Sequence, residues 1–299
     1  MRSRFRTRRP ADCVGLAAIV IALAACAGPS DPGSHDVVTA PAPDRIVAGP
    51  QGSVGQFVVE CRFDRFRADD PIVRPGAAGA SHLHQFFGAV GVSADSSQFD
   101  LVAGTTTCDQ QADTASYWAP SLISADGLPI EPMMSTAYYR AGPDVEPTLV
   151  VPFPPGLMLV AGDHGATAPQ PLSVVGWSCD VGSLRSGLPP DCTDARRLRM
   201  IVTFQDCWDG INIRSPILSD PDVHVSYSEA GECPGRHPVH IPQLQFAVDF
   251  EPVAPDGLSL SSGDILSGHA DFWNTWDQSK LANEVVRCIH RNLSCGISG

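Results

Sequence analysis

The sequence lacks the short motifs that mark the common catalytic sites. It contains no H-E-x-x-H, G-x-S-x-G, G-x-G-x-x-G or Walker loop, so the enzyme classes that depend on these motifs are not indicated. Its cysteines never occur as C-x-x-C, which argues against a cysteine-based zinc site. No cofactor follows from a motif, so the cofactor is unknown at this point.

Positive charge is also scarce. Lysine and arginine together number 20, against 33 aspartates and glutamates, and the formal net charge is −13. A surface this acidic repels phosphate backbones, so nucleic acid is not expected as a partner.

The first residues indicate export. A basic start is followed by an apolar run, residues 14–25, that is too short to span a membrane and is typical of a signal peptide. The run ends in Leu-Ala-Ala-Cys, which resembles a bacterial lipobox and predicts lipid attachment at Cys26. We therefore expect a protein anchored by that lipid at the outer face of the cytoplasmic membrane. The alternative is an ordinary signal peptide with Cys26 incidental.

Composition divides the rest of the chain in two. Residues 26–55 are rich in Pro, Gly, Ser and Ala and predict a flexible tether, whereas residues 56–299 contain no further linker and predict one domain. Eight cysteines in an oxidising compartment predict four disulfides. The expected pairs are sequential, because each then closes a short loop: Cys61–Cys108, Cys179–Cys192, Cys207–Cys233 and Cys288–Cys295.

Several segments alternate apolar and polar residues with a period of two. The clearest are residues 198–205 and 244–250, and residues 57–62 and 156–161 also predict strands. One helix is expected after Asp277, a good N-cap, with an apolar stripe that includes Leu281 and Val285. The predicted fold is mainly β, a β-sandwich with long loops, one C-terminal helix and four disulfides.

Histidines, acids and tryptophans gather in segments that we interpret as loops. His82 and His84 would share one face of an extended segment, which suits a common metal or substrate, although both could simply be hydrogen-bonded beneath Phe86 and Phe87. Trp208 and Asp209 follow a predicted strand and suit either a site rim or a disulfide-anchored turn. Further candidates come later in the chain: His224, His237, His269, Asp271, Trp273 and Asn274.

Ordered motifs along the whole domain resemble a family of secreted bacterial and fungal proteins, catalogued as domain of unknown function nineteen-ninety-six. They include Asp70-Pro71-Ile72-Val73, Ser81 to Gly88 (SHLHQFFG), Cys207 to Gly210 (CWDG), Cys233-Pro234 with His237-Pro238, and His269-Ala270-Asp271-Phe272. The resemblance implies a cell-wall or polysaccharide context by association with carbohydrate-binding modules in fungal members. Gln85 and Ala89 depart from the pattern, where Asp and Asn are common.

Three functions remain in competition. The leading hypothesis is a site that binds or cleaves extracellular polysaccharide, with Asp209 and Asp271 as acid and base and with His82 and His84 assisting. In that hypothesis the substrate is bound by the following side chains: Trp208, His224, His237, His269, Trp273 and Asn274. The second is a metal-binding module with His82, His84 and either His224 or His269 as ligands. The third is a non-catalytic wall-binding or scaffold protein.

Overall fold

The computed structural model describes residues 48–49, 52–53, 55–194, 197–217 and 219–296. The predicted signal peptide, the lipidation site Cys26 and most of the tether lie outside the described residues. All described residues belong to one unit that spans residues 43–299. None of the helices in this described part has the length and apolarity that a membrane span requires.

The larger of two main sheets has six strands in the order β10-β11-β15-β8-β3-β18. Its members are β3 (Gln56–Cys61), β8 (Met134–Arg140), β10 (Val175–Cys179), β11 (Leu198–Thr203), β15 (Gln243–Phe250) and β18 (Ser294–Cys295). All neighbours pair antiparallel except β18 and β3, which are parallel.

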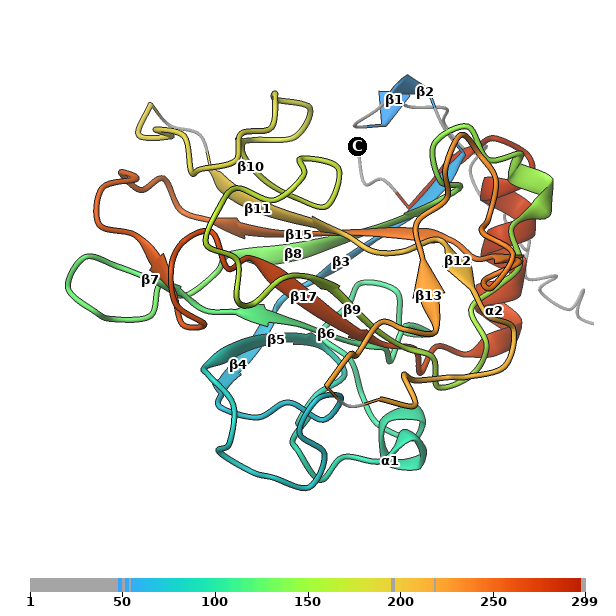
Figure 1. Ribbon diagram of the computed structural model, residues 1–299, viewed down its shortest axis with the longest axis horizontal. Coiled ribbons are helices and arrows are strands. Elements are labelled where there is room, and N and C mark those ends of the chain that lie inside the picture. Colours follow the sequence, from blue (N-terminus) through green and yellow to red (C-terminus); the bar gives the residue numbers. More distant parts are fainter. Residues whose placement is uncertain (1–47, 50–51, 54, 195–196, 218, 297–299) are drawn as a thin grey trace, which may run out of the picture. The chain divides into compact units, whose positions relative to one another are not determined.

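The second main sheet has five antiparallel strands in the order β4-β5-β6-β17-β9. Its members are β4 (Phe63–Arg67), β5 (His84–Gly88), β6 (Ser116–Pro120), β9 (Met158–Gly162) and β17 (His269–Trp273). Figure 1 shows the two sheets as stacked layers, with the C-terminal helix at one end.

Shorter elements complete the described part. The small strands are β1 (Ala48–Gly49), β2 (Gly52–Ser53), β7 (Leu122–Ile123), β12 (Cys207–Trp208), β13 (Val225–Ser226), β14 (Val239–His240) and β16 (Ser259–Leu260). The helical elements are α1 (Gln98–Val102), a 3-10 turn at Pro147–Leu149, α2 (Gln278–Glu284) and a π-helical turn at Val285–Ile289.

The main core lies between the two sheets. Because strand side chains alternate, β15 sends Phe246 inward, where its ring lies 5.5 Å from Tyr117 of β6 and 5.8 Å from Phe87 of β5. All three rings are buried. Contacts of this kind define a β-sandwich and confirm the predicted fold class.

A chain of polar groups crosses this core. The Tyr117 hydroxyl donates to Asp113 Oδ2 (2.6 Å) and also contacts the Tyr139 hydroxyl of the opposite sheet, to which the Trp276 indole N–H donates (3.1 Å). Asp113 Oδ1 accepts from the backbone N–H of Ala115 (2.9 Å). Burial raises the pKa of Asp113 to about 8, although these hydrogen bonds oppose the shift.

The C-terminal helix follows the expected pattern. Asp277 is its N-cap and accepts from the backbone N–H of Lys280 (2.9 Å), while Leu281 and Val285 are fully buried. Four disulfides are present and join Cys61 to Cys108, Cys179 to Cys192, Cys207 to Cys233 and Cys288 to Cys295. The last of them ties the end of the helical segment to β18.

Replacing Leu281 with Ala should lower the free energy of unfolding by about 2–5 kcal/mol, because the fully buried side chain leaves a cavity. Denaturant unfolding with the disulfides intact measures the change. Val286→Ala, at a side chain that is 53% exposed in the same segment, serves as the control and should change stability by less than about 0.5 kcal/mol. Equal effects would show that the helix does not pack on the sandwich.

Asp113 should make the domain less stable as pH rises. Its carboxyl keeps its proton in the folded chain up to about pH 8 but loses it in the unfolded chain near the ordinary value of 3.8. The unfolded state therefore binds fewer protons in this window, and stability should fall by up to about 1.4 kcal/mol per pH unit. Denaturant unfolding between pH 5 and 7 should show that Asp113→Asn changes the slope of stability against pH in the positive direction relative to the wild type. The exposed Asp126→Asn should keep the wild-type slope, and identical slopes in all three proteins would contradict the assignment.

Candidate metal centre

The candidate site lies on the outer face of the five-stranded sheet. In β17, Ala270 and Phe272 point into the main core, so His269, Asp271 and Trp273 point to the other side. Asp271 is directly opposite Trp118 of β6 and Val160 of β9. The sequence pattern predicts loops for these polar residues, but His84 and His269 to Trp273 belong to strands, because the sheet has a second buried face outside the sandwich.

Three imidazoles meet at this face although they come from distant parts of the chain. His82 Nε2 lies 3.1 Å from His269 Nε2, and the rings of His82 and His84 have centroids 4.2 Å apart. Each of the three offers a ring nitrogen, and these atoms lie within 4.8 Å of one another. Gly162 of β9 is paired with His269 of β17 and lets the two strands approach closely at this point, since an added Cβ would lie 2.8 Å from the His269 Cα.

Backbone carbonyls orient two of the rings. His84 Nδ1 donates to the carbonyl oxygen of Asp69 (2.9 Å), and His269 Nδ1 donates to that of Ser267 (2.9 Å). A carbonyl can only accept, so Nδ1 carries the proton and Nε2 keeps its lone pair. In His84 this Nε2 is buried and has no hydrogen-bond partner. Metal-binding histidines are typically held in this way by their second nitrogen.

The loop that supplies the Asp69 carbonyl is itself fixed. The Asp69 carboxylate accepts from the backbone N–H groups of Gly79 (2.8 Å) and Ala94 (3.0 Å) and also pairs with Arg67. These hydrogen bonds and the Arg67 charge lower the pKa of Asp69 despite its burial. A buried, ionised Asp69 therefore holds two loops against the sheet and positions the acceptor for His84.

Burial keeps the three imidazoles uncharged. Desolvation, followed by the nearby His164, lowers the pKa of His82 to about 4, and desolvation lowers that of His269 to about 3. The fully buried His84 is shifted in the same direction, by desolvation and then by the other two rings. Neutral imidazoles are the form that binds metal, so no proton has to be displaced at neutral pH.

Two buried carboxyl groups adjoin the histidines. Asp70, His84 and Asp271 each offer a ligand atom, and these atoms also lie within 4.8 Å of one another. Asp70 accepts from the backbone N–H groups of Ile72 (3.0 Å) and Val73 (2.9 Å), whereas neither oxygen of Asp271 has a partner. Burial, and then the neighbouring Asp70, raises the pKa of Asp271 well above its ordinary value.

Polar atoms without hydrogen-bond partners are concentrated here. Besides His84 Nε2 and the two Asp271 oxygens, the indole nitrogens of Trp118 and Trp273 are buried and unpaired. Such groups are rare in folded proteins because each costs about 1–3 kcal/mol. Their accumulation on β17 and its neighbours makes this face suited to hold a polar ligand or an ion.

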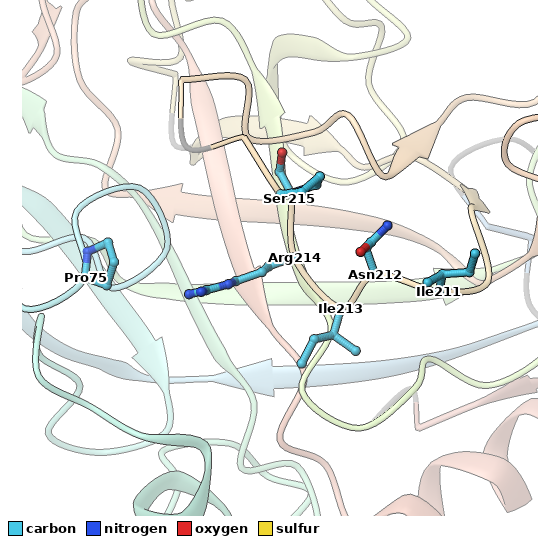
Figure 2. A pocket seen from close by; sticks show the side chains of 7 residues that line it. Pro75, Ile211, Asn212, Ile213, Arg214 and Ser215 are labelled. Carbon is cyan, nitrogen blue, oxygen red and sulfur yellow. The ribbon is translucent and has the colours of Figure 1, made fainter.

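Hollows with shared lining residues lie beside the site. A cavity of about 200 Å³ is lined by His269, His164, Asp163 and Asp222, among others, and it shares Pro221 with a hollow of only about 10 Å³ beside Ile72. That hollow shares Arg214 and Ser215 with a wider one of about 510 Å³. Figure 2 shows Arg214 extending from the 211–216 segment toward Pro75 across this wider hollow.

A comparison with protein families now identifies the chain. A family model described as Domain of unknown function (DUF1996) matches residues 70–276, which is more than half of the sequence. The chain belongs to this family. The match begins at Asp70 and ends at Trp276, and so contains all three histidines and both buried acids. No curated protein and no solved structure matches the chain.

Several predicted residues of this DUF1996 domain make structural contacts elsewhere. Asp209 closes a turn: its Oδ1 accepts from the backbone N–H groups of Ile211 and Asn212 (both 2.8 Å), and its Oδ2 accepts from Asn212 Nδ2 (2.6 Å). These hydrogen bonds lower the pKa of Asp209 although partial burial opposes them. Trp208 Nε1 donates to the carbonyl of Asn212 (2.6 Å) within the same turn.

The remaining predicted residues are tied to backbone carbonyls. His224 Nε2 donates to Met158 (2.8 Å), His237 Nε2 donates to Val223 (3.0 Å), and Asn274 Nδ2 donates to Pro154 (2.8 Å). The third imidazole beside His82 and His84 is thus His269, and His224 is not part of the group. His224 lies near Trp273 instead, since Met158 is paired with that residue.

Asp70 and His164 lie beside the histidines, although neither is among the site residues that the sequence predicts. The His164 ring lies 6.1 Å from that of His269, and both residues line the same cavity. The signal for Asp70 was its place in the DPIV motif, which starts the family match.

The metal-free protein should keep His82, His84 and His269 neutral at pH 5.5, well below the ordinary histidine pKa of roughly 6.5. Long-range proton–nitrogen NMR spectra should show the Nδ1-protonated tautomer for His84 and His269. The same spectra of the denaturant-unfolded chain are the control, since its imidazoles should titrate normally. Ordinary titration of all three rings in the folded protein would contradict the burial argument.

Proposed function

We propose that this DUF1996 protein binds one transition-metal ion through His82, His84 and His269. The observation that carries the proposal is the orientation of the rings. Nδ1 of His84 and Nδ1 of His269 each donate to a backbone carbonyl, which leaves Nε2 of each ring as the atom that can bind a shared ion. Imidazole ligands suit zinc, copper, iron and nickel. Three protein ligands leave a coordination position for water or substrate, as in catalytic metal sites.

The buried acids complete the electrostatics of such a centre. A divalent ion held by three neutral imidazoles would bring uncompensated positive charge into the protein interior. Asp271, unpaired and next to His84, could supply the compensating charge with Asp70 beside it. Burial favours the protonated form of Asp271 in the absence of the ion, and a bound cation would favour loss of that proton. The bound ion would supply Lewis acidity, and Asp271 would accept a hydrogen bond or a proton at its edge.

The predicted signal peptide suggests where in the cell the protein acts. We include export and lipid anchoring through Cys26 in the proposal, because the basic start, the apolar run and the Leu-Ala-Ala-Cys sequence support it. Four disulfides in the domain are in keeping with an oxidising compartment. The protein would then act at the outer face of the cytoplasmic membrane.

Extracellular polysaccharide is the second candidate, as a substrate or as a binding partner. The cavity of about 200 Å³ beside His269 supports it, because a small part of a sugar chain could enter there. The Asp209 and Asp271 pair supports it less, since Asp209 uses both carboxylate oxygens in its own turn. Within this candidate, the metal centre is the stronger catalytic element.

Metal titration tests the proposal directly. Protein purified without an affinity tag and treated with chelator should bind zinc or copper at one ion per chain in calorimetry. His82→Gln should weaken this binding by more than the roughly 10–100-fold that outer partners of a metal site contribute. His82 is suitable because it is only partly buried and its removal leaves the strands intact.

His237→Gln is the matched control, since this imidazole is partly buried, as His82 is, but lies outside the group of three. Its metal affinity should equal that of the wild type. Cobalt absorption spectra add a readout of coordination that does not depend on any activity. If the wild type takes up no stoichiometric metal, or if both variants bind equally well, the three-histidine centre is refuted.

A further inference from the structure

The outer face of the six-stranded sheet carries an unusual concentration of arginine. Strand register places Arg140 of β8, Gln245 of β15 and Arg199 of β11 on the side away from the main core, whose members are their sequence neighbours Tyr139, Leu244 and Leu198. Arg185, from the loop after β10, reaches the same face. In a chain with a net charge of −13, this clustering needs an explanation.

One carboxylate neutralises part of the group. Arg199 donates through Nη2 to Asp249 Oδ2 (2.7 Å) and through Nε to Oδ1, and Arg197 Nη1 lies 3.1 Å from the same Oδ2. Asp249 therefore pairs with two guanidinium groups. Its bidentate pairing with Arg199 is a stable arrangement and neutralises the positive charge in the middle of the face.

Among the described residues, Arg140 and Arg185 have no carboxylate partner. Arg140 Nη2 donates to Gln245 Oε1 (2.8 Å), and Arg185 Nη2 donates to the same neutral oxygen. Arg140 is fully buried, and its Nε and Nη1 have no hydrogen-bond acceptor. Across the described ranges, no carboxylate lies within ion-pair distance of either residue.

This arrangement is costly unless an anion completes it. Two like charges share one amide oxygen, and a buried guanidinium with unused donors loses its hydration without compensation. Burial, and then the charge of Arg185, lowers the pKa of Arg140 to about 10, so the group remains cationic at neutral pH. Negative charge with several acceptor atoms would complete the arrangement.

There is room for such a group. A cavity of about 250 Å³ lies over this face and is lined by Arg185, Arg199, Gln245 and the acidic Asp180, among others, whereas Arg140 lies outside its lining. It is smaller than the roughly 300–1,000 Å³ of typical pockets for drug-sized molecules, which limits the ligand to a small one. Arg185 reaches it from the loop, and Gln245 connects it to Arg140.

We propose that this cavity is a binding site for a small oxyanion, a phosphate, sulfate or carboxylate group, held by Arg185 with Arg140 behind it. The planar forks of guanidinium groups match the paired oxygens of all three anions. The site lies over the outer face of the six-stranded sheet, whereas the three histidines lie at the outer face of the five-stranded sheet. Figure 1 shows these two sheets as separate layers. The oxyanion site is independent of the metal centre, so either proposal can be refuted without affecting the other.

Calorimetry on chelator-treated protein tests the site without interference from a bound metal. Inorganic phosphate, sulfate and acetate are titrated separately at constant ionic strength maintained with chloride. At least one of them should bind saturably at one per chain and raise the melting temperature. The tetrahedral and planar anions distinguish which ligand geometry the site prefers.

Arg185→Gln should reduce the affinity by roughly tenfold or more, because a charge-assisted hydrogen bond is lost. Arg185 is partly exposed, so the variant should fold, and circular dichroism checks this. Arg236→Gln is the control, since it makes the same charge change at an exposed position and should bind as the wild type does. The proposal is overturned if none of the anions binds saturably, or if Arg185→Gln and Arg236→Gln bind equally.

Discussion

The alternation of side chains along β17 is the constraint on which both the fold and the candidate site depend. Ala270 and Phe272 fill the space between the sheets, while His269 and Asp271 occupy the opposite face. The strand is hydrogen-bonded on both sides, by β6 and by β9, so a shift of one residue would reverse every side chain. Packing of the core therefore also fixes the positions of the polar groups.

Each sheet thus has a second buried face, and the two faces differ in charge. The five-stranded sheet has two buried acids and three neutral imidazoles. The six-stranded sheet has two guanidinium groups that share one amide oxygen. Buried polar groups without hydrogen-bond or charge partners lower the stability of a domain. The sandwich core and the disulfides must therefore supply the stability that these two faces do not provide.

Sequence patterns were informative where the local rule and the final structure agree. The alternation in β11 and β15, the Asp277 N-cap and the pairing of nearby cysteines all depend on short-range order. Strands β5 and β17 were missed because their polar positions face a buried site and interrupt the usual contrast of apolar and polar sides. The meeting of His82 with His269 spans 187 residues, and only the assembled sheet produces it.

The parallel pairing of β18 with β3 has a consequence for biogenesis. Ser294 and Cys295 lie beside Gln56 and Phe57, although 238 positions separate them along the chain. Strand β3 therefore keeps an open edge while the intervening residues are being synthesised, and such edges attract other strands. Closure of this edge comes late, so a nascent chain would need protection from aggregation until residues 288–295 have emerged.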